Sequence, residues 1–298
     1  MKFATAPIRP LICLGVGLAV GAAAFLGAPV AASAAEPEGA YWHTRTLSTS
    51  THPWKFGTRT NSYSLVQQRI TERWTTPDGK SWFGYRELGT LPKSAADKKA
   101  WQRDGSPAKW SSSIDGKTVK LSTQPAKGDL TPIRNPNEFQ LGGQRLTYDE
   151  VQRLPADPNG LKTWLTKAAQ AGRVPAPSID RWITGTLQNL LYTIPAPKEV
   201  RAAAYNALLT MPGVRSQGNA TDSLGRSGAA VLVESTTKQK KHTTTVKIKL
   251  TVDTGRMVLL SEDQTVWLNG KRLEGKSPSQ TIVEAGWTDS EPVVPALP

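Results

Sequence analysis

The chain has one cysteine and three histidines among its 298 residues, and this scarcity restricts its chemistry. The cysteine is Cys13, inside an apolar N-terminal segment, so the remainder carries no thiol. Disulfide bonds, cysteine zinc sites and thiol nucleophiles are therefore excluded there. No histidine lies three to five residues from another, so a metal site would need ligands from distant parts of the chain. We expect no metal and no cofactor, with His43, His52 and His242 at the surface or on strand faces.

Signatures of several enzyme classes are also missing. The sequence has no phosphate-binding loop and no dinucleotide glycine fingerprint. In Gly225-Arg226-Ser227-Gly228 the second glycine comes one position too early for a serine hydrolase, so we interpret the segment as a turn between strands. Glycoside hydrolysis needs a pair of carboxylates, and the sequence does not single out such a pair among its 24 acidic residues. The sequence therefore favours binding over catalysis, and an unrecognised hydrolase is the alternative.

The N-terminus lacks acidic residues before Glu36. Lys2 and Arg9 precede Leu11–Ala28, a stretch without charged or strongly polar side chains. A basic start followed by an apolar segment is typical of an export signal.

Small residues at Ala32 and Ala34 fit a signal peptidase, and we expect residues 1–34 to be removed by cleavage after Ala34. The alternative is an uncleaved anchor, because Leu11–Val30 has about the 20 residues that cross a bilayer. Both interpretations place the following residues outside the cytoplasm, in the cell envelope or beyond it.

Basic residues outnumber acidic ones throughout the chain. After cleavage, 35 basic and 24 acidic side chains would remain, a formal net charge of +11 with neutral histidines. Such a field attracts an exported protein to anionic lipid headgroups or wall polymers, and we expect no nucleic acid partner. Solubility alone is the alternative explanation. The one basic cluster, Lys238–His242, is predicted to be a solvated hairpin tip.

Residues 41–91 have the period of β-strands. Val66, Ile70 and Trp74 lie on one side of an alternating segment. The polar side of the same segment carries Arg69, Thr71, Arg73 and Thr75. Pro77–Lys80 has the composition of a turn, and Trp82, Phe83 and Tyr85 belong to the returning strand. We predict a meander of three strands.

Residues 92–145 are poor in apolar periodicity and rich in Pro, Gly, Ser, Asp and Lys, with strand-like pieces only near Lys117–Thr123. We expect a loop-rich insertion, which in a compact domain is often a functional loop or lid.

Residues 147–211 are predicted to form four helices. Thr147 and Glu150 form a capping box at the first, and Asp157 caps the second with Pro158 at its first position. Ser178 is expected to cap the third, and Pro197 opens the fourth.

The period of two returns after Gly213. Thr245–Val252 alternates without error, Asp253–Arg256 turns the chain, and Met257–Leu260 returns. Ala229–Glu234 and Thr281–Ala285 are further predicted strands, and the tail 291–298 is expected to be frayed.

Strands on both sides of a helical block indicate an α+β fold. We predict a curved antiparallel sheet, built from N- and C-terminal strands, that packs on the four helices. Residues 35–290 are expected to form one domain, with two subdomains as the alternative.

Tryptophan is abundant, with ten residues, six of them in the first 110. Core packing explains most of them, because aromatic side chains suit pleated surfaces. The alternative is a ligand groove, and Trp42, Trp74 and Trp82 on predicted strands are its candidate residues.

Several phrases together resemble one actinobacterial family of exported or membrane-anchored proteins of unknown function, often encoded beside extracytoplasmic-function sigma factors. The phrases are Tyr41-Trp42-His43-Thr44-Arg45-Thr46, Glu72-Arg73-Trp74-Thr75, Asp104-Gly105-Ser106-Pro107, Leu154-Pro155-Ala156-Asp157-Pro158, Val200-Arg201-Ala202-Ala203, Met211-Pro212-Gly213-Val214, Asp222–Gly228 and Val252-Asp253-Thr254-Gly255-Arg256. The likeness spans most of residues 40–263.

The family's arrangement of elements is similar to the lipoprotein-carrier fold, in which a curved sheet closes on helices around an apolar cavity. The resemblance implies a lipid or lipopeptide ligand, or a sensor of envelope state linked to sigma-factor regulation. We therefore expect a non-enzymatic envelope protein that binds a lipid-like or peptide partner. A basic, tryptophan-rich binder of wall polymer is the alternative. The resemblance implies no catalytic residue.

Overall fold

The computed structural model describes residues 36–114, 117–133, 139–273, 275 and 277–298. These residues belong to one compact unit, Ala34–Pro298. The expected export segment 1–34, with Ala32 and Ala34, lies outside the described residues. In the described part of the chain, every helix is too short or too polar to cross a bilayer.

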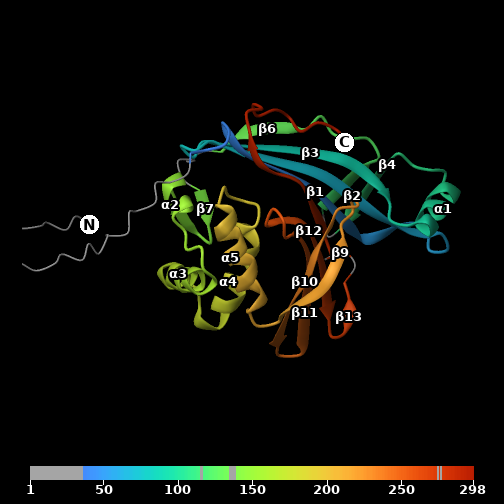
Figure 1. Ribbon diagram of the computed structural model, residues 1–298. Helices are drawn as coiled ribbons and strands as arrows, with labels where there is room; N and C mark the ends of the chain where they lie inside the picture. Colours follow the sequence, from blue (N-terminus) through green and yellow to red (C-terminus); the bar gives the residue numbers. More distant parts are fainter. Residues whose placement is uncertain (1–35, 115–116, 134–138, 274, 276) are drawn as a thin grey trace, which may run out of the picture. The chain divides into compact units, whose positions relative to one another are not determined.

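The chain folds into strands, then helices, then strands (Figure 1). The strands are β1 (Tyr41–Gly57), β2 (Ser62–Thr75), β3 (Ser81–Pro92), β4 (Lys109–Ile114), β5 (Lys117–Ser122), β6 (Asp129–Pro132), β7 (Phe139–Leu141), β8 (Gln144–Leu146), β9 (Val214–Thr221), β10 (Ser227–Gln239), β11 (His242–Asp253), β12 (Val258–Leu268), β13 (Lys271–Arg272) and β14 (Ser279–Thr288). The helices are α1 (Ala95–Arg103), α2 (Tyr148–Gln152), α3 (Pro158–Ala171), α4 (Ile179–Leu190) and α5 (Lys198–Leu209), with a 3-10 turn η1 (Ala176–Ser178) before α4.

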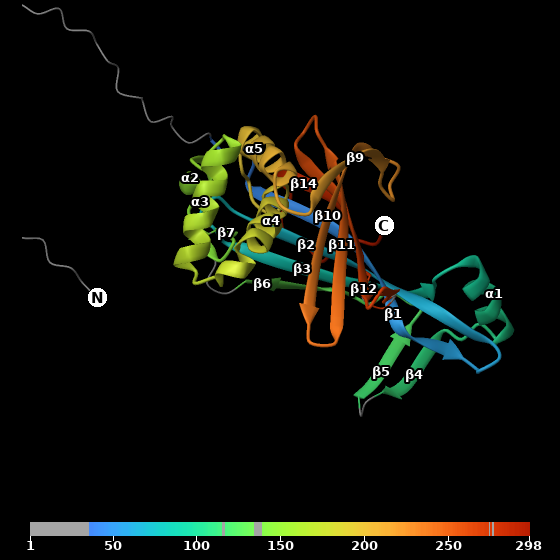
Figure 2. The same cartoon turned by 90° about the horizontal axis from the view of Figure 1, so that it is seen from below.

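One antiparallel sheet joins the two ends of the chain. In the described residues its order is β6-β3-β2-β1-β14-β12-β11-β10-β9, with β13 paired to β12. The junction is the pairing of β1 with β14, from Tyr41 opposite Thr288 to Thr49 opposite Ser279. The predicted α+β fold with a curved sheet of N- and C-terminal strands is therefore confirmed (Figure 2).

The predicted turns and the C-terminal strands are confirmed as well. Asp253 Oδ1 accepts hydrogen bonds from the amides of Gly255 and Arg256, which closes the turn between β11 and β12. The basic cluster forms the tip between β10 and β11. Residues 222–226 turn the chain between β9 and β10.

Arg226 leaves that last turn and links two neighbouring C-terminal strands of the sheet, β12 and β14. Its guanidinium donates hydrogen bonds to the carbonyl oxygens of Leu260 in β12 and Ile282 in β14, at 3.2 and 2.7 Å. Asp222 holds the Arg226 side chain with an ion pair of 2.6 Å. The glycine-rich segment 225–228 therefore serves the architecture of the sheet.

The four predicted helices are α2 to α5. Thr147 forms the expected capping box with Glu150, and Asp157 accepts a hydrogen bond from the amide of Gly160 at 2.7 Å. The expected side-chain cap by Ser178 is wrong, because Ser178 already has helical dihedral angles at the end of η1 and makes no such bond. The 3-10 turn runs directly into α4, so the chain there needs no side-chain cap.

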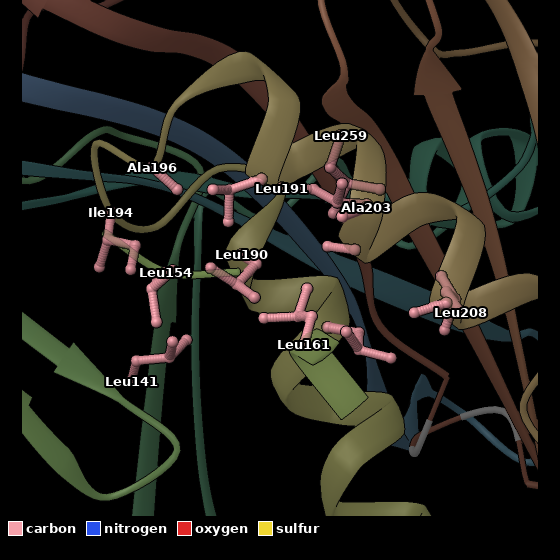
Figure 3. Packing of buried hydrophobic residues seen from close by; sticks show 14 of the residues in the cluster. Leu141, Leu154, Leu161, Leu190, Leu191, Ile194, Ala196, Ala203, Leu208 and Leu259 are labelled. Carbon is pink, nitrogen blue, oxygen red and sulfur yellow. The ribbon is translucent and has the colours of Figure 1, made fainter. Parts of the chain in front are cut away.

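The helices pack on the inner face of the sheet, which we define as the face that carries Trp42. The largest cluster of buried apolar side chains lies between them (Figure 3). It includes Leu161, Leu165, Ile183, Leu187, Leu190, Leu191, Val200, Leu208, Val231, Leu250, Val252 and Ile282.

The segment 92–145 differs from the loop-rich insertion that we expected. It contains α1 and the strands β4 to β8, and Ser94 caps α1 by accepting a hydrogen bond from the amide of Asp97. A second apolar cluster holds it to the far ends of β1 and β2. The cluster consists of Phe56, Tyr63, Leu65, Ala100 and Leu121, with Trp101, Trp110 and Val119 beside it. These elements are too short for their apolar residues to form a visible period.

The tail 291–298 also differs from the frayed end that we expected. It runs along the outer face of β1 to β3, opposite the helices (Figure 1). Pro295 is buried there, and Ala296 O accepts a hydrogen bond of 2.9 Å from the Arg45 guanidinium. Prolines exclude a strand at this point, but they do not prevent packing on a flat surface.

Candidate binding groove

The inner face of the meander is polar over most of its width. Strand register places Thr44 of β1 opposite Arg73 of β2, and Arg73 opposite Phe83 of β3. Two residues along each strand, Thr71 and Tyr85 take the next places on this face. The alternating polar side of β2 therefore faces the helices, and its apolar side faces outward.

Two hollows follow this inner face. The first has a volume of about 440 Å³ and lies between the meander and Tyr192, which follows α4. The apolar residue Phe83 also lines it, and its polar wall consists of Thr44, Thr46, Ser48, Arg69, Thr71, Glu72, Arg73, Tyr85 and Gln280.

The second hollow, of about 250 Å³, lies between the meander and the β4-β5 hairpin. Lys109 and Lys120 line it from the polar side of that hairpin. Arg69 and Tyr85 line both hollows, so the two adjoin. We call the combined space the inner groove.

Cations dominate the inner groove, which four basic side chains line. All four are exposed, and in the described part of the chain none of them forms an ion pair. The four are Arg69, Arg73, Lys109 and Lys120. Partial desolvation of its guanidinium lowers the pKa of Arg73, although the residue as a whole is exposed.

Two acidic residues, Glu72 and Glu87, also line the groove and offset these four cations only in part, because Glu72 pairs with Arg45 and His43. Glu87 is engaged by Tyr85, whose hydroxyl donates to Glu87 Oε1 at 3.0 Å. Burial and the neighbouring Glu87 raise the pKa of Tyr85, and the positive charge of Arg69 opposes that rise. The groove thus keeps an excess of positive charge that a ligand could neutralise.

Tyr192 and Glu262 are half-buried ionisable residues beside the groove. Burial, assisted by the negative charge of Glu262, raises the pKa of Tyr192 to about 12, so its hydroxyl stays protonated. Burial and the adjacent Asp263 also raise the pKa of Glu262. Glu262 pairs with Gln280, a residue of the groove wall.

The three candidate tryptophans do not share one surface. Trp42 lies on the inner face, inside the main apolar cluster, and its Nε1 donates to Tyr192 O at 3.2 Å. Trp74 pairs with Trp82, and both belong to the outer face. Alternation decides this, because Trp42 stands opposite Thr75 and its chain neighbour His43 stands opposite Trp74.

Sequence reasoning did not select the residues of the inner groove. A usable signal was present, because Arg69, Thr71 and Arg73 repeat at a spacing of two. The periodicity alone does not say which side of a strand meets the helices. The sequence around Lys109 and Lys120 shows no such repeat. These two residues line the groove only because the β4-β5 hairpin lies against the meander.

The histidines do not assemble a metal site. His43 lies between Glu72 and Glu284, at 2.8 and 3.3 Å, and stacks on Trp74. His52 is buried, and that burial lowers its pKa. In the described ranges, no group of three or more His, Cys, Asp or Glu residues is placed to hold a metal ion.

Another hollow, of about 510 Å³, lies beside Trp42, Tyr148 and Trp287. Its aromatic rings pack edge to face on one another. Arg201, its most buried cation, already donates to the carbonyl oxygens of Ala196, Arg256 and Met257. This arrangement stabilises the fold, so the inner groove is the better candidate for a ligand.

The fold and the groove define an α+β protein with a curved antiparallel sheet and a basic inner groove. No family model matches the chain, and comparisons with curated proteins and with solved structures give no match. The actinobacterial resemblance and its lipoprotein-carrier fold remain predictions.

Proposed function

We propose that this protein is a non-catalytic binder of an anionic wall polymer, which it holds in the inner groove. The observation that carries the proposal is the set of four exposed cations that line the two hollows without ion-pair partners in the described residues. Charged hydrogen bonds from Arg and Lys to phosphate or carboxylate groups are the strong ones in proteins.

The remaining lining fits a hydroxyl-rich polymer. Thr44, Thr46 and Ser48 line one wall with largely buried hydroxyl side chains, and the more open amide residues Gln67, Gln68 and Gln124 line the second hollow. Polyol or sugar units offer matching donors and acceptors between their anionic groups. An elongated ligand would occupy both hollows, whereas a single small anion would use only one.

Export supports the proposal from the sequence side. The predicted signal segment would bring the protein to the compartment where such polymers are found. Its net positive charge would raise their concentration near the surface at low ionic strength.

The test compares two variants with the same change of net charge. Arg69→Gln with Arg73→Gln removes two groove cations, and Lys240→Gln with Lys241→Gln removes two from the hairpin tip. We expect the groove variant to bind a glycerol phosphate oligomer at least ten-fold more weakly in calorimetry, and the tip variant to change less than two-fold. Binding by the unaltered protein should weaken steeply with salt. Equal losses in both variants would mean that general charge attraction, not the groove, holds the polymer.

A lipid ligand is the second candidate, and one observation favours it. Phe83 is 41% exposed inside the first hollow, where an acyl chain could contact it. If a lipid is the ligand, Phe83→Ser should abolish uptake of a fluorescent fatty acid, and salt should have little effect. The polar majority of the lining is the reason that we place this candidate second. Regulation through a sigma factor stays a prediction.

A further inference from the structure

The outer face of the meander carries an aromatic surface with a notch at Gly84, which a peptide segment of the chain already covers; we call this surface the outer groove. Its floor is Trp74 of β2 and Gly84 of β3, and Trp82 packs edge to face on Tyr41 beside it. The occupant is the tail 291–298. A methyl group on Gly84 would lie 2.9 Å from Cγ and Cδ of Pro295 and 3.2 Å from the Trp74 ring. The missing side chain at position 84 therefore makes room for the proline ring.

The tail is held by few contacts. Pro295 is buried, and Arg45 donates to the next carbonyl oxygen, that of Ala296, at 2.9 Å. The residues around it are more open, since Val293 is 58% and Leu297 is 50% exposed, and Val294 is 38% exposed with its side chain beside Gly128. The tail also has no strand pairing. A segment that belonged to the core would bury its apolar side chains, whereas this one buries mainly its proline.

This is the mode in which proteins recognise proline-rich segments. An extended proline peptide keeps its shape when free, so it loses little entropy on binding to an aromatic surface. A donor aimed at a backbone carbonyl beside the proline then fixes the register, as Arg45 does here.

We propose that the groove formed by Trp74, Gly84 and Arg45 is a recognition site for a proline-containing extended peptide of a partner protein. The chain's own tail, residues 291–298, occupies this site and competes with the partner peptide. Because the tail is covalently attached, it occupies the groove at a high effective concentration, and a partner peptide binds only when it displaces the tail. The site lies on the face opposite the inner groove and does not depend on the proposed function.

The test removes the competitor. A variant that ends at Ser290 should remain folded, shift its tryptophan fluorescence to the red, and bind a synthetic peptide of residues 290–298. The full chain should bind that peptide at least ten-fold more weakly. Pro295→Gly in the full chain should give an intermediate affinity, because it loosens the tail without removing it.

Gly84→Ala is the matched control in the shortened protein. It fills the place of the proline ring and keeps Trp74, so peptide affinity should fall at least ten-fold while binding in the inner groove stays unchanged. Equal affinity with and without this substitution would overturn the proposal, as would no peptide binding by the folded, shortened chain. An unfolded shortened chain, with no peptide binding by Pro295→Gly, would show instead that the tail is an integral part of the fold.

Discussion

The two faces of the β1-β3 meander use the same strands for opposite purposes. The inner face presents arginines, hydroxyls and an exposed Phe83 to a hollow. The outer face packs aromatic and apolar side chains under the tail, and Trp74 is only 2% exposed. Neighbouring residues of one strand therefore have different roles. Those on the outer face stabilise the fold, and those on the inner face are available to a ligand. Polar side chains of an α+β sheet therefore face the helices where the space between them is a groove and not a core.

The largest expected effect concerns the aromatic floor of the outer face. Trp74→Ala should lower the free energy of unfolding by about 3 to 5 kcal/mol, because it opens a cavity where Pro295 and His43 now pack. Phe83→Ala on the inner face should cost less than about 1 kcal/mol, because that ring is already exposed. Urea denaturation of both variants measures the difference. Similar losses of unfolding free energy in the two variants would show that the inner and outer faces contribute equally to stability.

The next effect concerns a buried ion pair on the outer face. Glu72 is 4% exposed and contacts His43 at 2.8 Å and Arg45 at 3.0 Å. The Arg45 contact is electrostatic, since it lacks the alignment of a hydrogen bond. Glu72→Gln should cost about 2 kcal/mol, because it leaves Arg45 without its counter-charge beneath the tail.

Arg73→Gln is the inner-face counterpart of that substitution, and it should be neutral for stability within about 0.5 kcal/mol. A large loss from Arg73→Gln would indicate that the groove cations hold the fold together and are not reserved for a ligand.

The smallest effect depends on pH. The folded protein raises the pKa of Glu262, so the protonated carboxyl is favoured on folding. That contribution is complete below the ordinary pKa of glutamate and is lost as the pH rises through the raised value. Glu262→Gln should therefore increase the melting temperature at pH 7, where the native carboxyl is forced to ionise in a partly buried place. The gain should shrink towards pH 4, and a gain that is equal at both pH values would contradict the burial of this carboxylate.

Local patterns predicted the elements well where each element carries its own signal. The capping box at Thr147, the N-cap at Asp157 and the alternation of Thr245–Val252 each depend on neighbours within four residues. Short elements gave no such signal. The strands β7 and β8 have three residues each, too few for a period, and they form because they pack under the helices.

The groove required long-range information. Arg73 and Lys109 line hollows that adjoin only because the β4-β5 hairpin folds back over the meander. The aromatic candidates illustrate the same limit, because their separation onto two faces follows from strand register. A register is set by pairing partners far apart in the chain, and composition does not contain it.

The sequence by itself determined the class of elements, their caps and turns, and the absence of a thiol after Cys13. The tertiary structure alone decided which side of the meander meets the helices, and it placed the proline-rich tail over Trp74. The physical reason is that alternation separates the two sides of a strand but does not show which side faces the helices. Only the packing of the whole chain, through the pairing of β1 with β14, assigns one side to the groove and the other to the tail.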